Sequence, residues 1–131
     1  EANRHWDNIE GLHCKNIFLR DKKGRQHYLA ILPSYKSVDI KKLNLLLEER
    51  LSFASPERLM KHLGLEPGSV SPFGLINDLS RHVILVIDEG VLMADKVNFH
   101  PNVNTATVTL ACSDFKRYLE ECGNSIIPIN F

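Results

Sequence analysis

The 131-residue chain is short of cysteine, of long apolar runs and of net charge. Its three cysteines, Cys14, Cys112 and Cys122, are odd in number and form no C-x-x-C pair, so neither a disulfide framework nor a zinc ribbon is expected. Free thiols favour a reducing, cytoplasmic location. No apolar run approaches the roughly 20 residues of a membrane span, and we therefore expect no membrane partner.

Acidic and basic residues balance at 16 each, so bulk electrostatics give no support to nucleic-acid binding. The distribution is more informative, because basic residues gather between positions 15 and 42, where Asp21 and Asp39 are the acidic ones. The basic residues there are Lys15, Arg20, Lys22, Lys23, Arg25, Lys36, Lys41 and Lys42. This half of the chain could orient a polyanion. A solvated hairpin tip and helix face is an equally good interpretation.

Hydrophobic periodicity and turn formers predict an α/β (α+β) protein, with residues 1–131 forming a single compact domain. The connections are too short for most parallel crossovers, so the sheet should be mixed and largely antiparallel, with helices packed around it. Residues 14–19 and 27–32 should form a hairpin, and further strands are expected at 83–87, 91–97, 105–111 and 126–131. Helices are expected from Asp39 to about Arg50, from Ser55-Pro56 to Gly64, and from Ser113 to Gly123.

The segment from Gly68 to Asp78 is rich in turn formers and carries almost no charge. Glycine and proline around small hydroxyl residues give a backbone that can approach a ligand closely and present its N–H groups. Such a backbone suits a pocket wall, and the amides of Gly68 to Ser71 could stabilise an oxyanion. An ordinary tight connection is the alternative.

Three segments together resemble the YbaK/ProXp-ala family of aminoacyl-tRNA deacylases, which is related to the editing domain of bacterial prolyl-tRNA synthetases. They are the Lys15-Asn16 pair that opens a strand, the loop from Gly68 to Asp78, and Phe99-His100-Pro101 followed by Asn104-Thr105. The resemblance runs from about Trp6 to Leu119 and is closest to the ProXp-ala branch. It implies a curved, barrel-like sheet. Family members usually carry an additional N-terminal helical segment, which we expect this chain to lack.

The resemblance implies a trans-editing enzyme that hydrolyses mischarged alanyl-tRNA for proline, without a cofactor. Its implied partners are the mischarged tRNA(Pro) and either prolyl-tRNA synthetase or an elongation factor. Two other functions stay open at this point: hydrolysis of cysteinyl-tRNA for proline, and a non-catalytic module that binds aminoacyl-tRNA. Alanine is smaller than proline, so a pocket that blocks proline could sort them; Ile17, Phe73, Leu75 and Ile76 are candidates for its wall.

An aminoacyl ester is activated, so positioning and oxyanion stabilisation can suffice for its hydrolysis. The resemblance implies Lys15 and His100 as catalytic residues. The substrate-binding candidates are Asn16, Gly68, Ser69, Ser71, Pro72, Phe73, Gly74 and Asn104. Regular alternation would place Asn16 on the opposite side of its strand from Lys15, so the two could share a pocket only at a bulge or bend. No histidine spacing suggests a metal, and we expect none.

Overall fold

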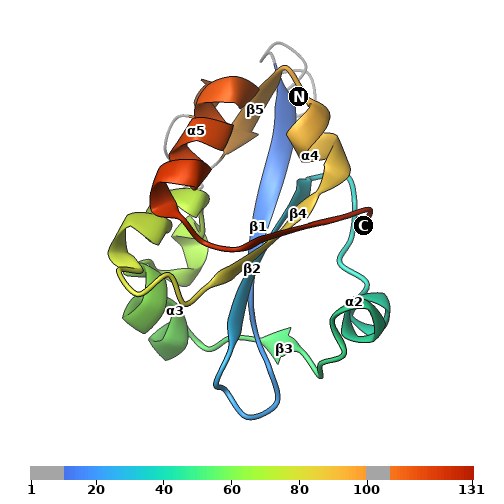
Figure 1. The fold of residues 1–131 in the computed structure, drawn as a ribbon, viewed down its shortest axis with the longest axis vertical. Coiled ribbons are helices and arrows are strands. Elements are labelled where there is room, and N and C mark those ends of the chain that lie inside the picture. The colour runs from blue at the N-terminus through green and yellow to red at the C-terminus, as the bar shows by residue number, and fades with distance from the viewer. Residues whose placement is uncertain (1–10, 100–106) are drawn as a thin grey trace.

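The computed structural model describes residues 11–99 and 107–131, and one mixed sheet organises them (Figure 1). The sheet has seven strands in the order β6-β5-β1-β2-β4-β7, and β3 pairs with the outer part of β1. The strands are β1 (Leu12–Arg20), β2 (His27–Pro33), β3 (Ser52–Phe53), β4 (Ile84–Asp88), β5 (Lys96–Phe99), β6 (Val108–Ala111) and β7 (Ile126–Ile129).

The predicted hairpin is confirmed, because β1 and β2 pair antiparallel from Cys14↔Pro33 to Arg20↔His27. The pairs β1–β3 and β5–β6 are also antiparallel, whereas β1–β5, β2–β4 and β4–β7 are parallel. The expected mixed α+β architecture is therefore confirmed. All seven residues of β2 are buried, as is typical of a central strand that is covered on both faces.

The helices are α2 (Ile40–Leu47), α3 (Pro56–Leu63), α4 (Glu89–Met93) and α5 (Cys112–Cys122), with 3₁₀ turns η1 (Pro67–Ser69) and η2 (Pro72–Asn77). Local signals fixed α3 as predicted: the Ser55 hydroxyl accepts a hydrogen bond from the Arg58 amide, and Gly64 ends the helix with φ of 67°. The predicted helix at Ser113 begins at Cys112 instead. None of the helices in the described residues is long and apolar enough to cross a membrane.

The strand predicted at 91–97 is wrong in its first half. Asp88 accepts a hydrogen bond from the Gly90 amide at 2.7 Å and so caps the short helix α4. The chain then enters β5, which pairs with β1 rather than with β4. The connection after residue 87 is therefore a helical crossover between two strands that are not neighbours.

Two apolar clusters cover the two faces of the sheet. On one face, Phe18 and Leu29 of the hairpin pack with residues of α3, η2 and α5. On the other face, Leu19 and Leu32 pack with Leu43 of α2 and with the C-terminal strand. Figure 1 shows α3 and α5 on one side of the hairpin and α2 on the other. Because the faces alternate along β1, its residues are divided between two environments.

Candidate active site

Lys15 and Asn16 line one cleft of about 290 Å³. The remaining wall comes from Ser34, just after β2, and from the segment around Gly68. The structure therefore brings together residues that are more than 50 positions apart in the sequence. Two of the three segments predicted to form the site meet here.

An opening in the sheet explains how neighbours on one strand share this cleft. The strand β1 pairs regularly with β2 through this region, without a bulge. On its other edge, the pairing with β5 ends at Cys14, and the pairing with β3 begins at Leu19. Between them, residues 15–18 have no strand partner on that edge within the described part of the chain. Side chains from both faces can reach the opening, so the expected bulge is not required.

The polar groups in the cleft are poorly satisfied by the protein itself. The Oδ1 atom of Asn16 is buried and has no hydrogen-bond partner among the described residues. Lys15 is half-buried and forms no salt bridge within residues 11–99 and 107–131. Buried polar atoms are normally paired, so such an acceptor is a site that a ligand can fill. An unpaired ammonium next to it adds affinity for an anionic or oxygen-rich ligand.

Cys14 also lines the cleft, but it is not a nucleophile. Burial raises the pKa of its thiol to about 12, partly opposed by a backbone hydrogen bond from Asn98. The thiolate is the reactive form of cysteine, and at neutral pH this side chain stays protonated. Cys14 therefore contributes to the wall of the cleft and not to its chemistry.

An apolar hollow of about 390 Å³ adjoins the cleft and shares Asn16, Pro67 and Val70 with it. Ile17 and Leu59 contribute to its otherwise apolar wall. Ile17 is thus the one predicted wall residue found beside the cleft among the described residues. Leu75 and Ile76 instead line a separate hollow of about 320 Å³ between η2 and α5.

The loop from Gly68 to Gly74 is divided between the cleft and the core. Gly68 lines the cleft, and a side chain added there would meet open space. Ser69 is half-buried, and its amide donates to the Glu66 carbonyl at 2.9 Å, which removes it from the oxyanion donors that the loop could offer. Ser71 is 2% exposed and does not line the cleft.

The other predicted loop residues pack against neighbouring elements. Phe73 stacks edge-on against Phe99, with ring centroids 5.9 Å apart. The carbonyl of Pro72 accepts a hydrogen bond from the Tyr118 hydroxyl at 2.9 Å. A Cβ at Gly74 would lie 2.8 Å from the Leu63 carbonyl oxygen, so this glycine allows η2 to approach α3. These contacts hold the loop in place beside the cleft.

His100 and Asn104 lie outside the described residues, and their predicted roles stay predictions. Phe99, which precedes His100 in the sequence, pairs with Cys14 at the end of β5. Lys15 is the next residue along β1. The last described residue before position 100 is therefore next to the cleft.

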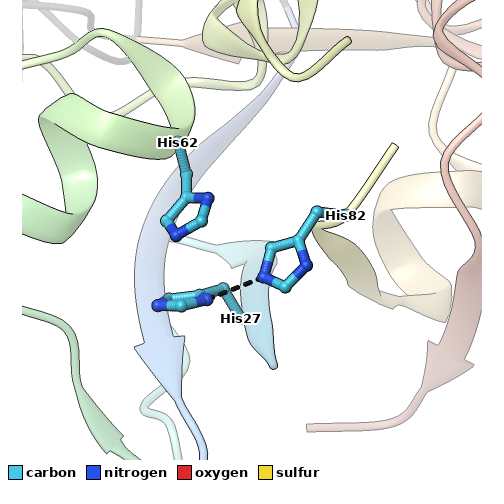
Figure 2. Close-up of side chains that lie close together, drawn as sticks. All are labelled: His27, His62 and His82. Atoms are coloured by element: carbon cyan, nitrogen blue, oxygen red, sulfur yellow. Dashed lines mark hydrogen bonds between the residues drawn. The ribbon is translucent and has the colours of Figure 1, made fainter. Parts of the chain in front are cut away.

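A second polar cluster lies at the other end of the hairpin and was missed by sequence reasoning (Figure 2). His27 from the start of β2, His62 from α3 and His82 from the segment before β4 bring their rings together. The Nδ1 atom of His27 lies 2.9 Å from Nε2 of His82. Burial, reinforced by these neighbours and by Arg58, lowers the pKa of His27 to about 4, and burial also lowers the pKa of His62. The His27 ring is therefore neutral at physiological pH.

Comparison with known proteins identifies the family of this chain. The model of the aminoacyl-tRNA editing domain family matches residues 5–118. The prolyl-tRNA editing protein ProX of Acetoanaerobium sticklandii is 44% identical over 116 residues, which cover 88% of this chain and 71% of that protein. The prolyl-tRNA synthetase associated domain-containing protein 1 of Mus musculus is 30% identical over 132 residues, which cover 97% of this chain and 78% of that protein.

A solved structure described as a candidate trans-editing enzyme for prolyl-tRNA synthetase has the same fold. Its TM-score is 0.69 at 21% identity, over 99% of this chain and 77% of that one. The chain therefore belongs to the aminoacyl-tRNA editing domain family. This confirms the resemblance and the expected class of enzyme, a deacylase that hydrolyses the ester bond of an aminoacyl-tRNA.

Proposed function

We propose that this chain is a freestanding deacylase that hydrolyses alanyl-tRNA mischarged for proline, with its active site in the cleft beside Lys15. The observation that carries the proposal is the juxtaposition of Lys15, Asn16 and Gly68 at the open edge of β1. The name of its relative ProX, a prolyl-tRNA editing protein, supports tRNA(Pro) as the substrate.

The two side chains of β1 bind different parts of the substrate. The ammonium of Lys15 holds the terminal phosphate or the ribose hydroxyls, because a compact cation pairs well with such oxygens. The unpaired Oδ1 atom of Asn16 accepts a hydrogen bond from the α-ammonium group of the aminoacyl moiety. Together they fix the ester carbonyl at the mouth of the cleft.

Hydrolysis then needs a water molecule rather than a protein nucleophile. The water oxygen attacks the ester carbonyl, the bond from this carbon to the ribose oxygen breaks, and the ribose oxygen takes a proton as it leaves. The neighbouring ribose hydroxyl helps to activate the water, and His100 orients it. The loop that begins at Gly68 stabilises the oxyanion through backbone amides other than that of Ser69.

The apolar hollow beside Asn16 receives the amino-acid side chain. Ile17, Phe18 and Leu59 on its wall offer contacts to a methyl group. The methyl group of alanine is smaller than the proline ring, so this wall favours alanine when the amino group is held at Asn16. Steric exclusion of the larger residue is the sorting principle of a second sieve.

The substrate tRNA(Pro) is the principal partner, with prolyl-tRNA synthetase or an elongation factor as the protein that delivers it. These partners belong to the cytoplasm, which is therefore the proposed location of this protein. Asn104 completes the substrate site, and the loop from Pro72 to Gly74 holds Gly68 in place through the contacts of Phe73 and Gly74.

One assay tests this proposal. The protein is incubated with tRNA(Pro) charged with alanine, cysteine or proline, and the release of free amino acid is followed over time. We expect rapid release of alanine, with cysteine slower and proline intact. Preferred release of cysteine would replace the proposed specificity with the cysteinyl one, and release from neither mischarged tRNA would leave a binding module.

A further inference from the structure

We propose that His27, His62 and His82 form a binding site for a divalent transition metal ion, with Zn²⁺ as the expected ion. One ligand nitrogen of each ring lies within 4.8 Å of the others. Imidazole nitrogen is a preferred ligand of zinc, and three protein ligands with an open fourth position are a common arrangement. This site is separate from the proposed hydrolytic cleft.

The three rings are packed more closely than hydrogen bonding explains. His62 has its ring centroid 4.1 Å from that of His27 and 4.7 Å from that of His82. Within the described residues, a single hydrogen bond connects two of the three rings, those of His27 and His82. The His62 ring forms none with the other two. Three imidazoles gathered in this way have lone pairs that a single cation would satisfy at once.

The surrounding residues hold the backbones of His27 and His82 and one face of the His27 ring. The side-chain amide of Gln26 donates to the His82 carbonyl at 2.6 Å and to the His27 carbonyl at 3.1 Å, so it ties their backbones together. Asp78 accepts a hydrogen bond from the His82 amide at 3.1 Å. Phe18 stacks on the His27 ring at 5.5 Å. Such outer contacts orient ligands before the metal arrives.

Binding of a zinc ion requires small changes in the distances between the three ligand nitrogens. A tetrahedral zinc ion with bonds of about 2.0–2.1 Å places its nitrogens about 3.4 Å apart. The His27 and His82 nitrogens are already 2.9 Å apart, so they must separate slightly while His62 moves inward. His62 is half-buried on α3. Figure 2 shows the three rings lying side by side, with a nitrogen of His27 facing one of His82.

Arg58 identifies the nitrogen that His27 would use. Its guanidinium is always protonated, so it donates to Nε2 of His27 at 3.1 Å, and the neutral His27 ring carries its proton on Nδ1. A metal bound at Nδ1 moves that proton to Nε2. Arg58 then loses this acceptor but keeps its hydrogen bond to the Gly24 carbonyl at 3.0 Å. Arg58 therefore opposes metal binding, both by its charge and by its N–H.

The ion would act in the structure rather than in hydrolysis. His27 pairs with Arg20, and Lys15 lies five residues away along β1, a distance of about 17 Å at the rise of an extended strand. The metal would join the hairpin, α3 and the segment before β4, which share no continuous stretch of sequence. Chelation should lower thermal stability and leave the rate of ester hydrolysis unchanged.

The test is calorimetric titration of chelator-treated full-length protein with ZnCl₂, together with thermal unfolding. We expect one zinc ion per chain and a zinc-dependent rise in Tm. His62→Gln should weaken binding at least 100-fold and abolish the rise, while Lys61→Gln, its exposed neighbour on α3, should behave as wild type. Because the His62 side chain forms no hydrogen bond within the described residues, its variant should fold.

Arg58→Gln provides the second readout. We expect it to bind zinc several-fold more tightly than wild type, since it removes the competing charge and donor. Equal zinc affinity in wild type and His62→Gln would overturn the site. Weaker binding by Arg58→Gln would overturn ligation through Nδ1 of His27, and with it the assignment.

Discussion

Replacing Asp88 by alanine should destabilise the protein strongly, because this carboxylate is buried and makes three hydrogen bonds. Its side chain is 1% exposed and accepts hydrogen bonds from the Lys36 ammonium at 3.0 Å, the Gly90 amide at 2.7 Å and the Phe131 amide at 3.0 Å. The alanine variant loses the cap of α4 and leaves the Phe131 amide without its acceptor.

The expected loss in the free energy of unfolding can be calculated from these contacts. Breaking a buried ion pair costs about 3–5 kcal/mol, because the remaining partner is left uncompensated. Lys36 is 26% exposed and can be partly rehydrated, so we expect the lower end, about 3 kcal/mol. At roughly 4 °C per kcal/mol for a domain of this size, the Tm should fall by about 12 °C.

The assay is urea denaturation followed by circular dichroism, with Asn130→Ala as the matched control. Asn130 also accepts a hydrogen bond from the Lys36 ammonium, at 3.1 Å, but in an exposed position. Its removal should cost less than about 0.5 kcal/mol. A loss below about 1 kcal/mol for Asp88→Ala, or equal losses for both variants, would refute the reasoning from burial.

Three further predictions test the loop, the hairpin tip and its turn. Gly74→Ala should lower the free energy of unfolding, measured by urea denaturation, by about 1–3 kcal/mol, since the added Cβ would lie 2.7 Å from Leu65 Cδ1 and 2.8 Å from the Leu63 carbonyl oxygen. An unchanged free energy of unfolding would show that η2 can shift to make room. Replacing the exposed Lys22 and Lys23 by glutamine should raise KM for tRNA and flatten its salt dependence, with kcat little changed; an unaltered salt slope would place the tip away from tRNA. Partial burial would raise the pKa of Asp21, but the backbone amides of Gln26 and Arg25 outweigh it and lower the pKa. The stabilisation from this carboxylate is therefore present above the unfolded pKa of about 3.9 and is lost as pH falls through the lower folded value. Asp21→Asn should thus be less stable than wild type at pH 7 and equal to it at low pH, and a difference that persists in acid would contradict this.

Local signals made much of the fold predictable from the sequence. Ser55-Pro56 and Gly64 specified both ends of α3, and the charged turn between β1 and β2 specified the hairpin. The segment after Asp88 could not be assigned in the same way. A short apolar run fits a strand or a helix equally well, and here the cap at Asp88 and the burial of Val91 against the core favoured the helix.

The candidate site depended on information that is not local. Alternation along β1 separates Lys15 from Asn16, and they share a cleft because β5 and β3 end on either side of them. The histidine cluster has the same origin. The parallel pairing of Tyr28 with Ile84 brings the segment before β4 beside the start of β2, where α3 adds His62. The spacing of these residues in the sequence predicts neither the cleft nor the histidine cluster.

The most direct test of the central claim is the single-turnover rate at which Lys15→Met hydrolyses alanyl-tRNA(Pro). The structure gives Lys15 no salt bridge among the described residues, so its free energy of unfolding should stay within about 1 kcal/mol of wild type. The rate should fall at least about 100-fold, as expected when a positioned charge is removed from a reacting centre. Lys116→Met, on the exposed face of α5, serves as the control and should retain the wild-type rate. A folded Lys15→Met protein that hydrolyses the ester as fast as this control would contradict the placement of the active site beside Lys15.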